Sequence, residues 1–341
     1  MYDLVFVTHI PVFYKINLYN KISEKKKIFV IFIAKETVAK RSKDFISLEN
    51  ATFDYVVLSE LAFELRNKFH SVRMLSKVLA ETSYKEIIVS GWDLVEFWAA
   101  AFLNKKSRLS LALESTIHES NFIGFRGTVK KIFLSRIALV YASGSAHNDL
   151  LDALNYKGRV KLTQGVGIIR KPPINCHIPS CVNYRIAYVG RLSEEKNLDS
   201  LINVINQYPN ITLELCGDGP ERSKLEKIAL GNVIFRGSVM NKELATIFLT
   251  SDFLVLPSRS EPWGLVVEEA LYFGLPVIVS DRCGVMEILK NGDNAHIISF
   301  ENFEAELKMI LDSYDANVQI FYGKNLNTLY AKDVYQVNAY L

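Results

Sequence analysis

Short apolar runs rich in β-branched residues alternate with stretches of helical spacing along most of this chain. In the first half, strands are predicted at residues 4–7, 28–33, 55–58, 87–90 and 109–113. Between them, segments such as 61–81 and 94–103 have the spacing of helices. This alternation predicts βαβ units and a parallel sheet, in which ligands bind beyond the carboxyl ends of the strands.

A proline-rich segment at 167–179 interrupts the alternation and suits a boundary between two domains in a chain of 341 residues. The pattern restarts with strands predicted at 184–189, 212–216, 233–236, 253–256, 277–280 and 296–298, and helices at 198–208, 220–230, 242–250, 265–273 and 285–290. We therefore expect two doubly wound domains, 1–166 and 184–320, joined by a linker over 167–183. A tail over 321–341 is expected to form a helix that packs back toward the first domain.

Positive charge is unevenly distributed along the sequence. The chain carries a net charge of +3, yet residues 1–165 hold 24 Lys and Arg against 16 Asp and Glu, and the remainder holds 16 against 21. A basic first half suits an anionic acceptor or an anionic membrane surface, or it is ordinary solvated surface. Nucleic acid is not an expected partner, because no nucleic-acid motif accompanies the basic residues.

Composition and cysteine spacing indicate a folded protein of the cytoplasm. Hydrophobic residues make up 49% and charged residues 23% of the chain, as in globular proteins. The N-terminus lacks the features of a secretory signal, and no apolar run is long enough to span a membrane, so any membrane contact is expected to be peripheral. Cys176, Cys181, Cys216 and Cys283 lack zinc-site spacing and are expected to be reduced thiols, with Cys216 in the core.

The most informative stretch, 256–277, reads as strand, polar loop and helix. Gly264 allows close backbone approach, and the N–H groups of Trp263, Gly264 and Leu265 would lie at a helix N-terminus, which favours a phosphate. Glu261 precedes the helix and Glu269 lies within it, suitably spaced to hold opposite ends of an elongated ligand. The alternative interpretation is a helix cap and a solvated glutamate.

Two further loops follow predicted strands of the second half. Arg191 and Lys196 are five residues apart across a turn, where a guanidinium and an ammonium can share a diphosphate, or are simply surface cations. The sequence 217–220, Gly-Asp-Gly-Pro, could cradle part of a nucleotide, although ordinary turns use the same residues.

Four motifs occur in order between residues 184 and 300. They are Gly190-Arg-Leu with Lys196-Asn197, Gly217-Asp-Gly-Pro220, Phe235-Arg-Gly237, and Glu261-Pro-Trp-Gly with Glu269-Ala. Together they resemble family 4 of the retaining nucleotide-sugar glycosyltransferases. The resemblance implies a GT-B fold, in which two Rossmann-like domains flank a cleft and the second domain holds most of the donor.

The resemblance also implies roles for individual residues. Glu261 would contact hydroxyls of the donor sugar and Glu269 those of the ribose, while Arg191 and Lys196 would bind the diphosphate. The remaining donor contacts implied are the amides of Trp263, Gly264 and Leu265, the glycine loops at Gly190 and Gly217, and the backbone of Arg236 beside the base.

The first half departs from the best-known pattern of this family. Where many members have a Gly-Gly loop, residues 9–15 read His-Ile-Pro-Val-Phe-Tyr-Lys, similar to a subgroup with a Pro-x-x-Tyr-Arg-like segment. Tyr14 and Lys15 are therefore candidates on the acceptor side, with Lys15 either supplying a cation or standing on a surface loop. Glu114 and His118 follow the strand at 109–113, and His118 would bind a donor hydroxyl, orient the acceptor, or be merely exposed.

Two basic segments, 125–139 and 61–81, have apolar residues at helical spacing. They suit contact with anionic lipid or a lipid-linked acceptor, or they pack on the sheet with their cations solvated.

We expect a retaining enzyme that transfers sugar from a nucleotide donor, by resemblance a UDP-sugar, to a glycan or lipid-linked acceptor in bacterial surface polysaccharide assembly. Glu261, Arg191, Lys196 and His118 are the expected catalytic set. No metal and no cofactor are expected, because cations and amides can neutralise the diphosphate. The alternatives are a nucleotide-sugar 2-epimerase of the same fold and a non-catalytic nucleotide-sugar-binding protein.

Overall fold

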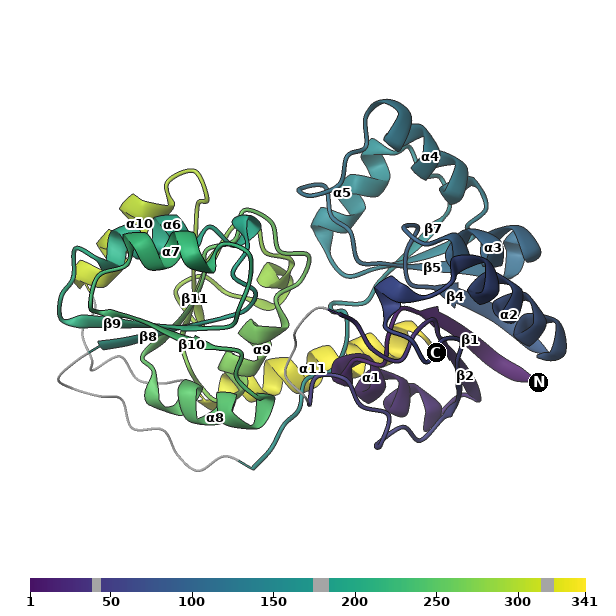
Figure 1. The fold of residues 1–341 in the computed structure, drawn as a ribbon, viewed down its shortest axis with the longest axis horizontal. Coiled ribbons are helices and arrows are strands. Elements are labelled where there is room, and N and C mark those ends of the chain that lie inside the picture. Colours follow the sequence, from purple (N-terminus) through teal and green to yellow (C-terminus); the bar gives the residue numbers. More distant parts are fainter. Residues whose placement is uncertain (39–43, 174–183, 314–321) are drawn as a thin grey trace. The chain divides into compact units, whose positions relative to one another are not determined.

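The computed structural model describes residues 1–38, 44–173, 184–313 and 322–341. The chain forms two compact units, each an α/β domain with a parallel sheet (Figure 1). The first unit extends to Ile168 and includes 333–341, and the second includes Asp44 and 169–332. Residues 167–173 therefore divide between the units, whereas 174–183 of the expected linker, with Cys176 and Cys181, lie outside the described residues.

The first domain contains a seven-stranded parallel sheet in the order β3-β2-β1-β4-β5-β6-β7. Its strands are β1 (Tyr2–Thr8), β2 (Ile28–Phe32), β3 (Asp54–Val57), β4 (Tyr84–Val89), β5 (Leu109–Leu113), β6 (Leu139–Ala142) and β7 (Arg159–Leu162). The strand order reverses between β1 and β4, which is the switch point where sheets of this kind bind ligands.

Helices cover both faces of the first sheet (Figure 1). One face packs against α2 (Lys68–Glu81), α3 (Val95–Leu103), α4 (Gly124–Ser135) and α5 (Ser145–Ala153). The other packs against α1 (Phe13–Ser23) and the last residues of α11 (Tyr322–Ala339), through Val337 and Tyr340. Single 3-10 turns, η1 (Phe63–Leu65) and η2 (Lys106–Arg108), precede α2 and β5.

The second domain has a six-stranded parallel sheet in the order β10-β9-β8-β11-β12-β13, the order of a dinucleotide-binding fold. The strands are β8 (Tyr184–Val189), β9 (Ile211–Cys216), β10 (Val233–Gly237), β11 (Phe253–Leu256), β12 (Val277–Ser280) and β13 (Ala295–Ile298). The helices are α6 (Leu198–Ile205), α7 (Arg222–Ile228), α8 (Asn241–Thr250), α9 (Leu265–Tyr272) and α10 (Phe303–Ser313), with 3-10 turns η3 (Glu194–Lys196) and η4 (Gly284–Ile288). Cys216 is buried, as expected for a core thiol.

The doubly wound fold expected from the sequence is confirmed, and the eleven predicted strands lie within a few residues of their observed positions. Two strands were not predicted. β6 is apolar and buried, but it follows the basic helix α4 so closely that its residues read as part of the same helical stretch. β7 is an exposed edge strand with Arg159 and Lys161 and lacks the apolar signal of a buried strand.

Several helix expectations need correction. The segment 61–81 is a 3-10 turn followed by a helix that begins only at Lys68, and 125–139 contains almost all of α4 and the first residue of β6. Residues 284–288 form a 3-10 turn instead of the helix expected at 285–290. In the described parts of the chain, no helix is both long enough and apolar enough to cross a membrane.

Candidate active site

The loops that follow β8 and β11 meet where the strand order of the second sheet reverses. β8 and β11 are hydrogen-bonded neighbours. Lys196 lies at the end of the first loop, and its Nζ donates a hydrogen bond to the carboxylate of Glu261 in the second loop over 2.7 Å. The two side chains are only 14% and 18% exposed. The structure thus brings two of the predicted donor-site residues together at the switch point of the sheet.

A backbone contact ties the same two loops together. The N–H of Arg259, after β11, donates to the carbonyl of Glu195, after β8, over 2.8 Å. Arg191 is exposed in the first loop, and its carbonyl accepts a 2.8 Å hydrogen bond from the hydroxyl of the buried Tyr188. The backbone of Arg191 is therefore held in place while its guanidinium remains accessible to an anion.

Tight backbone packing joins the ends of β8, β9 and β10. Gly217 has φ +150°, and a Cβ added there would lie 1.8 Å from the carbonyl oxygen of Gly190. The N–H of Gly217 donates to the carbonyl of Gly237 over 2.7 Å. Only glycine fits at position 217, so this loop is a fixed part of the sheet edge and not an exposed turn.

Arg236 braces two strands of the second sheet. Its guanidinium forms two hydrogen bonds, each 3.1 Å long, with the carboxylate of Glu214 on β9. The side chain is thus engaged in a bidentate pair, and the predicted contact of its backbone with a base remains a prediction.

Helix α9 begins directly after the loop that carries Glu261. Gly264 is its N-cap residue with φ 97°, in the left-handed region that favours glycine. The carbonyls of Glu261 and Trp263 accept hydrogen bonds from the N–H groups of Gly284 and Val285 over 2.9 and 2.8 Å. The loop is therefore fixed from η4, and the first N–H groups of α9, which have no partner within the helix, remain as donors for an anion.

The indole of Trp263 is buried and bonded to a residue that the sequence did not single out. Trp263 is 2% exposed and its Nε1 donates to Glu268 over 2.6 Å. The other carboxylate oxygen of Glu268 accepts a 2.8 Å hydrogen bond from Lys332 of α11. Trp263 therefore offers a ligand only its backbone. The sequence contained one signal of this buried glutamate. Two glutamates are adjacent in α9, and in a helix one of them must lie on the side of the buried Val267.

Glu269 is half-buried and its pKa is raised to about 8. Burial of the carboxyl is the main cause, and the negative charge of the adjacent Glu268 adds to it, while the positive charge of Arg170 acts in the opposite direction. The carboxyl is therefore mostly protonated at neutral pH.

The first domain has its own lysine–glutamate pair, at the carboxyl ends of its strands. Lys15 lies in α1 and its Nζ is 2.5 Å from the carboxylate of Glu114, which directly follows β5. It also donates to the hydroxyl of Thr8 over 3.2 Å. The expectation of a surface lysine on a loop is wrong: Lys15 is 6% exposed, because α1 begins at Phe13 and packs Lys15 against the sheet.

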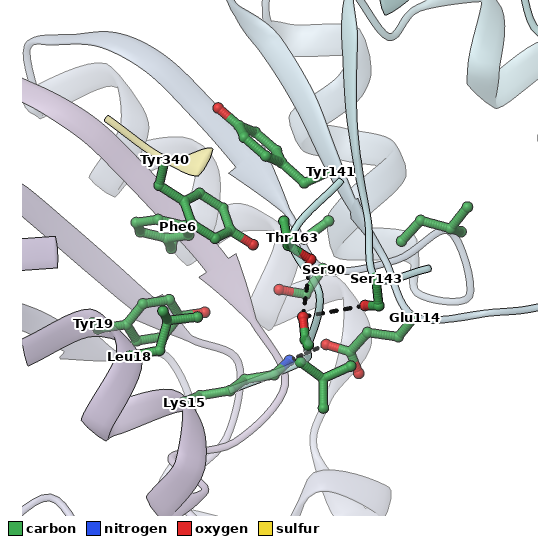
Figure 2. A pocket seen from close by; sticks show the side chains of 14 residues that line it. Phe6, Lys15, Leu18, Tyr19, Ser90, Glu114, Tyr141, Ser143, Thr163 and Tyr340 are labelled. Atoms are coloured by element: carbon green, nitrogen blue, oxygen red, sulfur yellow. Dashed lines mark hydrogen bonds and ion pairs between the residues drawn. The ribbon is translucent and has the colours of Figure 1, made fainter. Parts of the chain in front are cut away.

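Figure 2 shows the small cavity beside this pair, with Lys15 and Glu114 pointing toward each other on one side. The cavity is also lined by the hydroxyl residues Ser90, Ser143 and Thr163 and by the aromatic residues Phe6, Tyr19, Tyr141 and Tyr340. Its volume of about 20 Å³ suits a single water molecule. A sugar does not fit inside it, so an acceptor that meets Lys15 or Glu114 must do so from the open edge of the sheet.

The remaining candidates of the first domain are His118, in a loop after β5, and Tyr14, in α1. His118 is exposed after β5, and its N–H donates to the hydroxyl of Thr116 over 3.3 Å. Tyr14 is half-buried in α1. The sequence reasoning missed a pair at the switch point between β1 and β4, where His9 Nε2 lies 3.1 Å from the carboxylate of Asp93. The sequence did contain a signal for this pair, because His9 closely follows β1 and Asp93 closely follows β4.

The second domain thus offers two cations, a helix N-terminus and the carboxylate of Glu261 at one sheet edge, with Glu269 farther along α9. Two cations and a helix N-terminus are groups that suit an anion such as a diphosphate. Among the residues that the structure describes, no cluster of three or more His, Cys, Asp or Glu side chains is placed to hold a metal ion.

Comparison with known proteins agrees with this geometry. Residues 183–318 match the family model of the glycosyl transferases group 1. A Klebsiella pneumoniae protein described as an uncharacterized 41.2 kDa protein in the cps region is 27% identical over 302 residues, covering 86% of this chain and 75% of that protein.

Solved structures reproduce both domains. The apo form of the lipopolysaccharide outer core galactosyltransferase WaaB superposes with a TM-score of 0.72 at 15% identity, covering 99% of this chain and 98% of that one. Anabaena HepE in complex with UDP-glucose superposes with a TM-score of 0.71 at 17% identity, covering 99% and 97%. The two domains of this chain therefore have the GT-B fold of these solved structures, and residues 183–318 resemble the glycosyl transferases group 1.

Proposed function

We propose that this protein is a retaining hexosyltransferase that moves a sugar from a UDP-sugar to a glycan or lipid-linked acceptor in the assembly of a bacterial surface polysaccharide or lipopolysaccharide. One observation carries the proposal: the Lys196–Glu261 pair lies at the switch point of the second sheet, beside the start of α9. The similar proteins support the donor and the setting, because HepE is described with UDP-glucose and the Klebsiella protein lies in a cps region.

In the proposed reaction the Lys196–Glu261 pair separates when the donor binds. Lys196 and Arg191 turn to the diphosphate, which also accepts hydrogen bonds from the first N–H groups of α9. Glu261 accepts hydrogen bonds from the sugar hydroxyls, and Glu269 from the ribose. Negative charge develops on the departing diphosphate, and hydrogen-bond donors that are already in place stabilise it. Such electrostatic stabilisation is usually the largest single contribution to catalysis of this type.

The acceptor hydroxyl attacks from the face that the diphosphate leaves, so the configuration of the sugar is retained. The bond from the anomeric carbon to the diphosphate breaks as the bond to the acceptor oxygen forms, and the proton of the hydroxyl passes to the departing diphosphate. His118 orients the acceptor or a donor hydroxyl near the reacting carbon. The proposal needs no metal ion, because two cations and the helix amides neutralise the diphosphate. We therefore expect transfer to persist in the presence of a chelator such as EDTA.

A surface of the first domain supports an anionic membrane as the place where the acceptor is met. Ile123 and Phe125, at the start of α4, are 74% and 83% exposed. Arg126 and Lys131 are exposed on the same helix, which contains no acidic residue. Exposed apolar side chains next to cations suit the headgroup region of an anionic bilayer, and we propose peripheral binding at the cytoplasmic face of the membrane.

The function is tested by incubating the purified protein with labelled UDP- and GDP-sugars and with lipid and glycan acceptors. The expected result is acceptor-dependent release of the nucleotide and a product with the donor's anomeric configuration, measured by NMR. Glu261→Gln is expected to lower kcat/KM at least about 100-fold, because it removes the carboxylate that grips the sugar.

A matched control is Glu304→Gln, which changes an exposed glutamate of α10 in the same domain. Both variants should keep the thermal unfolding midpoint. Full activity of Glu261→Gln would reject the assignment. Formation of an epimerised sugar without an acceptor would instead identify a 2-epimerase, and binding without turnover a nucleotide-sugar-binding protein.

A further inference from the structure

Three polar side chains form a closed cluster inside the second domain. Trp263, Glu268 and Lys332 are 2%, 0% and 2% exposed. The carboxylate of Glu268 uses one oxygen for the indole N–H of Trp263, at 2.6 Å, and the other for the ammonium of Lys332, at 2.8 Å. The cluster therefore connects three elements: the loop before α9, α9 itself and the C-terminal helix α11.

Stability alone is a weak reason for such a cluster. Moving two charges out of water is costly, and a buried ion pair is often no more stabilising than apolar side chains of the same volume. Its directional hydrogen bonds fix geometry instead. What they fix here is the segment 261–264, which begins with Glu261 and ends at the N-cap residue Gly264.

We propose that Lys332 and Glu268 are positioning residues of the donor site, acting through the indole of Trp263. This inference rests on the proposed function of that site. The main chain at Trp263 is held from one side by the hydrogen bond of its carbonyl with Val285, over 2.8 Å, and its indole is held from the other by Glu268. With both ends fixed, the carboxylate of Glu261 and the amides that start α9 keep one arrangement.

The cluster makes the C-terminal helix part of the donor site. Lys332 is the last residue of α11 that belongs to the second unit. Without its ammonium, Glu268 would be a buried and uncompensated charge beside Glu269. Displacement of catalytic groups by about 1 Å can lower rates by about 100-fold, so a residue that touches no substrate still acts on the reaction.

The test separates positioning from stability by removing the charges singly and together. The probe is UDP, with its affinity measured by calorimetry at pH 9, above the pKa of about 8 of Glu269, so that protonation of that residue does not contribute. Lys332→Met is expected to lower the unfolding midpoint and to weaken UDP binding by about tenfold. The double variant Glu268→Met/Lys332→Met, which contains no buried charge, is expected to regain the midpoint but not the affinity.

Two further variants complete the experiment. Trp263→Phe keeps an aromatic ring and both charges, removes the indole N–H together with the five-membered ring of this buried side chain, and should weaken UDP binding several-fold. Lys227→Met replaces an exposed lysine at the end of α7 and should change neither quantity.

The outcomes distinguish the two proposals. If the wild-type protein binds none of UDP, GDP and ADP, the proposed function fails and this inference fails with it. If the wild-type protein binds UDP and the double variant binds it equally well, the proposed function stands and the positioning role is rejected.

Discussion

Each domain of this protein holds a lysine–glutamate pair at the carboxyl ends of its strands, and the two pairs differ in what surrounds them. Lys196 and Glu261 come from loops after adjacent strands, at 2.7 Å, beside the start of a helix whose first amides are open to a ligand. Lys15 comes from within a helix and meets Glu114 at 2.5 Å beside a cavity of about 20 Å³ whose lining includes tyrosines, other hydroxyl residues and apolar side chains. The same ionic contact therefore belongs to the proposed ligand site in one domain, and in the other it joins a buried lysine to a partly exposed glutamate at the edge of the core.

The electrostatics of Lys15 support this difference. Burial lowers the pKa of its ammonium, but the charge of Glu114 and the neighbouring tyrosines outweigh burial, and the net shift is upward. Lys15 thus remains charged in the core and is held by its partner. We interpret it as a residue that fixes Glu114 at the sheet edge, and its predicted contact with an acceptor stays a prediction.

The largest expected effect is on catalysis, from Lys196→Met. This variant removes a cation from the diphosphate and leaves Glu261 without its partner, so kcat/KM should fall about 100-fold or more. Steady-state kinetics with the labelled donor measure this change. An intact unfolding midpoint would confirm that the loss is local, and a variant with normal kinetics would place Lys196 outside the site.

Lys15→Met should show the opposite balance between stability and activity. Loss of the ammonium leaves the carboxylate of Glu114 unpaired at the edge of the core, and we expect the free energy of unfolding to fall by about 2 kcal/mol. Denaturant unfolding measures this value. We expect kcat/KM to change less than tenfold. A stable Lys15→Met protein without activity would instead mean that both lysines touch substrate, and the contrast between the two domains would be lost.

The third prediction concerns pH and is confined to the second domain. Glu269, with its pKa of about 8, is protonated in the free protein below that pH, whereas ribose hydroxyls are best bound by the carboxylate. UDP affinity should therefore rise from pH 7 to pH 8.5, by at most about tenfold per pH unit, because one proton is released on binding. Calorimetry across this range should show the rise in the wild-type protein and not in Glu269→Gln.

The same raised pKa sets the sign of a stability effect. Because the folded protein holds the proton of Glu269 more tightly than the unfolded chain does, this group contributes most below its ordinary pKa of 4.5, and that contribution is lost as pH rises toward 8. Glu269→Gln should therefore show a smaller loss of stability between pH 5 and pH 8 than the wild-type protein, by thermal unfolding.

The smallest expected effect is on the surface of the first domain. Ile123→Ser/Phe125→Ser should reduce binding to vesicles of phosphatidylglycerol and phosphatidylcholine about tenfold, because two exposed apolar side chains are lost. Co-sedimentation measures the change. The matched control is Met309→Ser, which removes an exposed apolar side chain of α10 in the second domain. Equal losses in both variants would argue against a membrane surface specific to the first domain.

The sequence by itself determined the architecture and most of the candidate donor site. Apolar runs and helical spacing depend on neighbouring residues, so the strands and their parallel arrangement could be predicted from them. Gly264 and Glu261 belong to one strand–loop–helix segment, whose geometry is set locally by a glycine and a helix start. Lys196 was also expected near Glu261, because loops at the carboxyl ends of strands in one sheet lie at one edge.

Only the tertiary structure decided which charged residues are buried and with which partners. Glu268 and Glu269 are adjacent, yet the first is fully buried against Trp263 while the second is half-buried with a raised pKa. Lys332 donates a hydrogen bond to Glu268 although the two residues are 64 positions apart in the sequence. Lys15 reads as a surface residue in sequence and is buried in the fold. Such pairings depend on which helix packs on which face, and a charged side chain carries no local signal of that packing, because its burial is favourable only once its partner is in place.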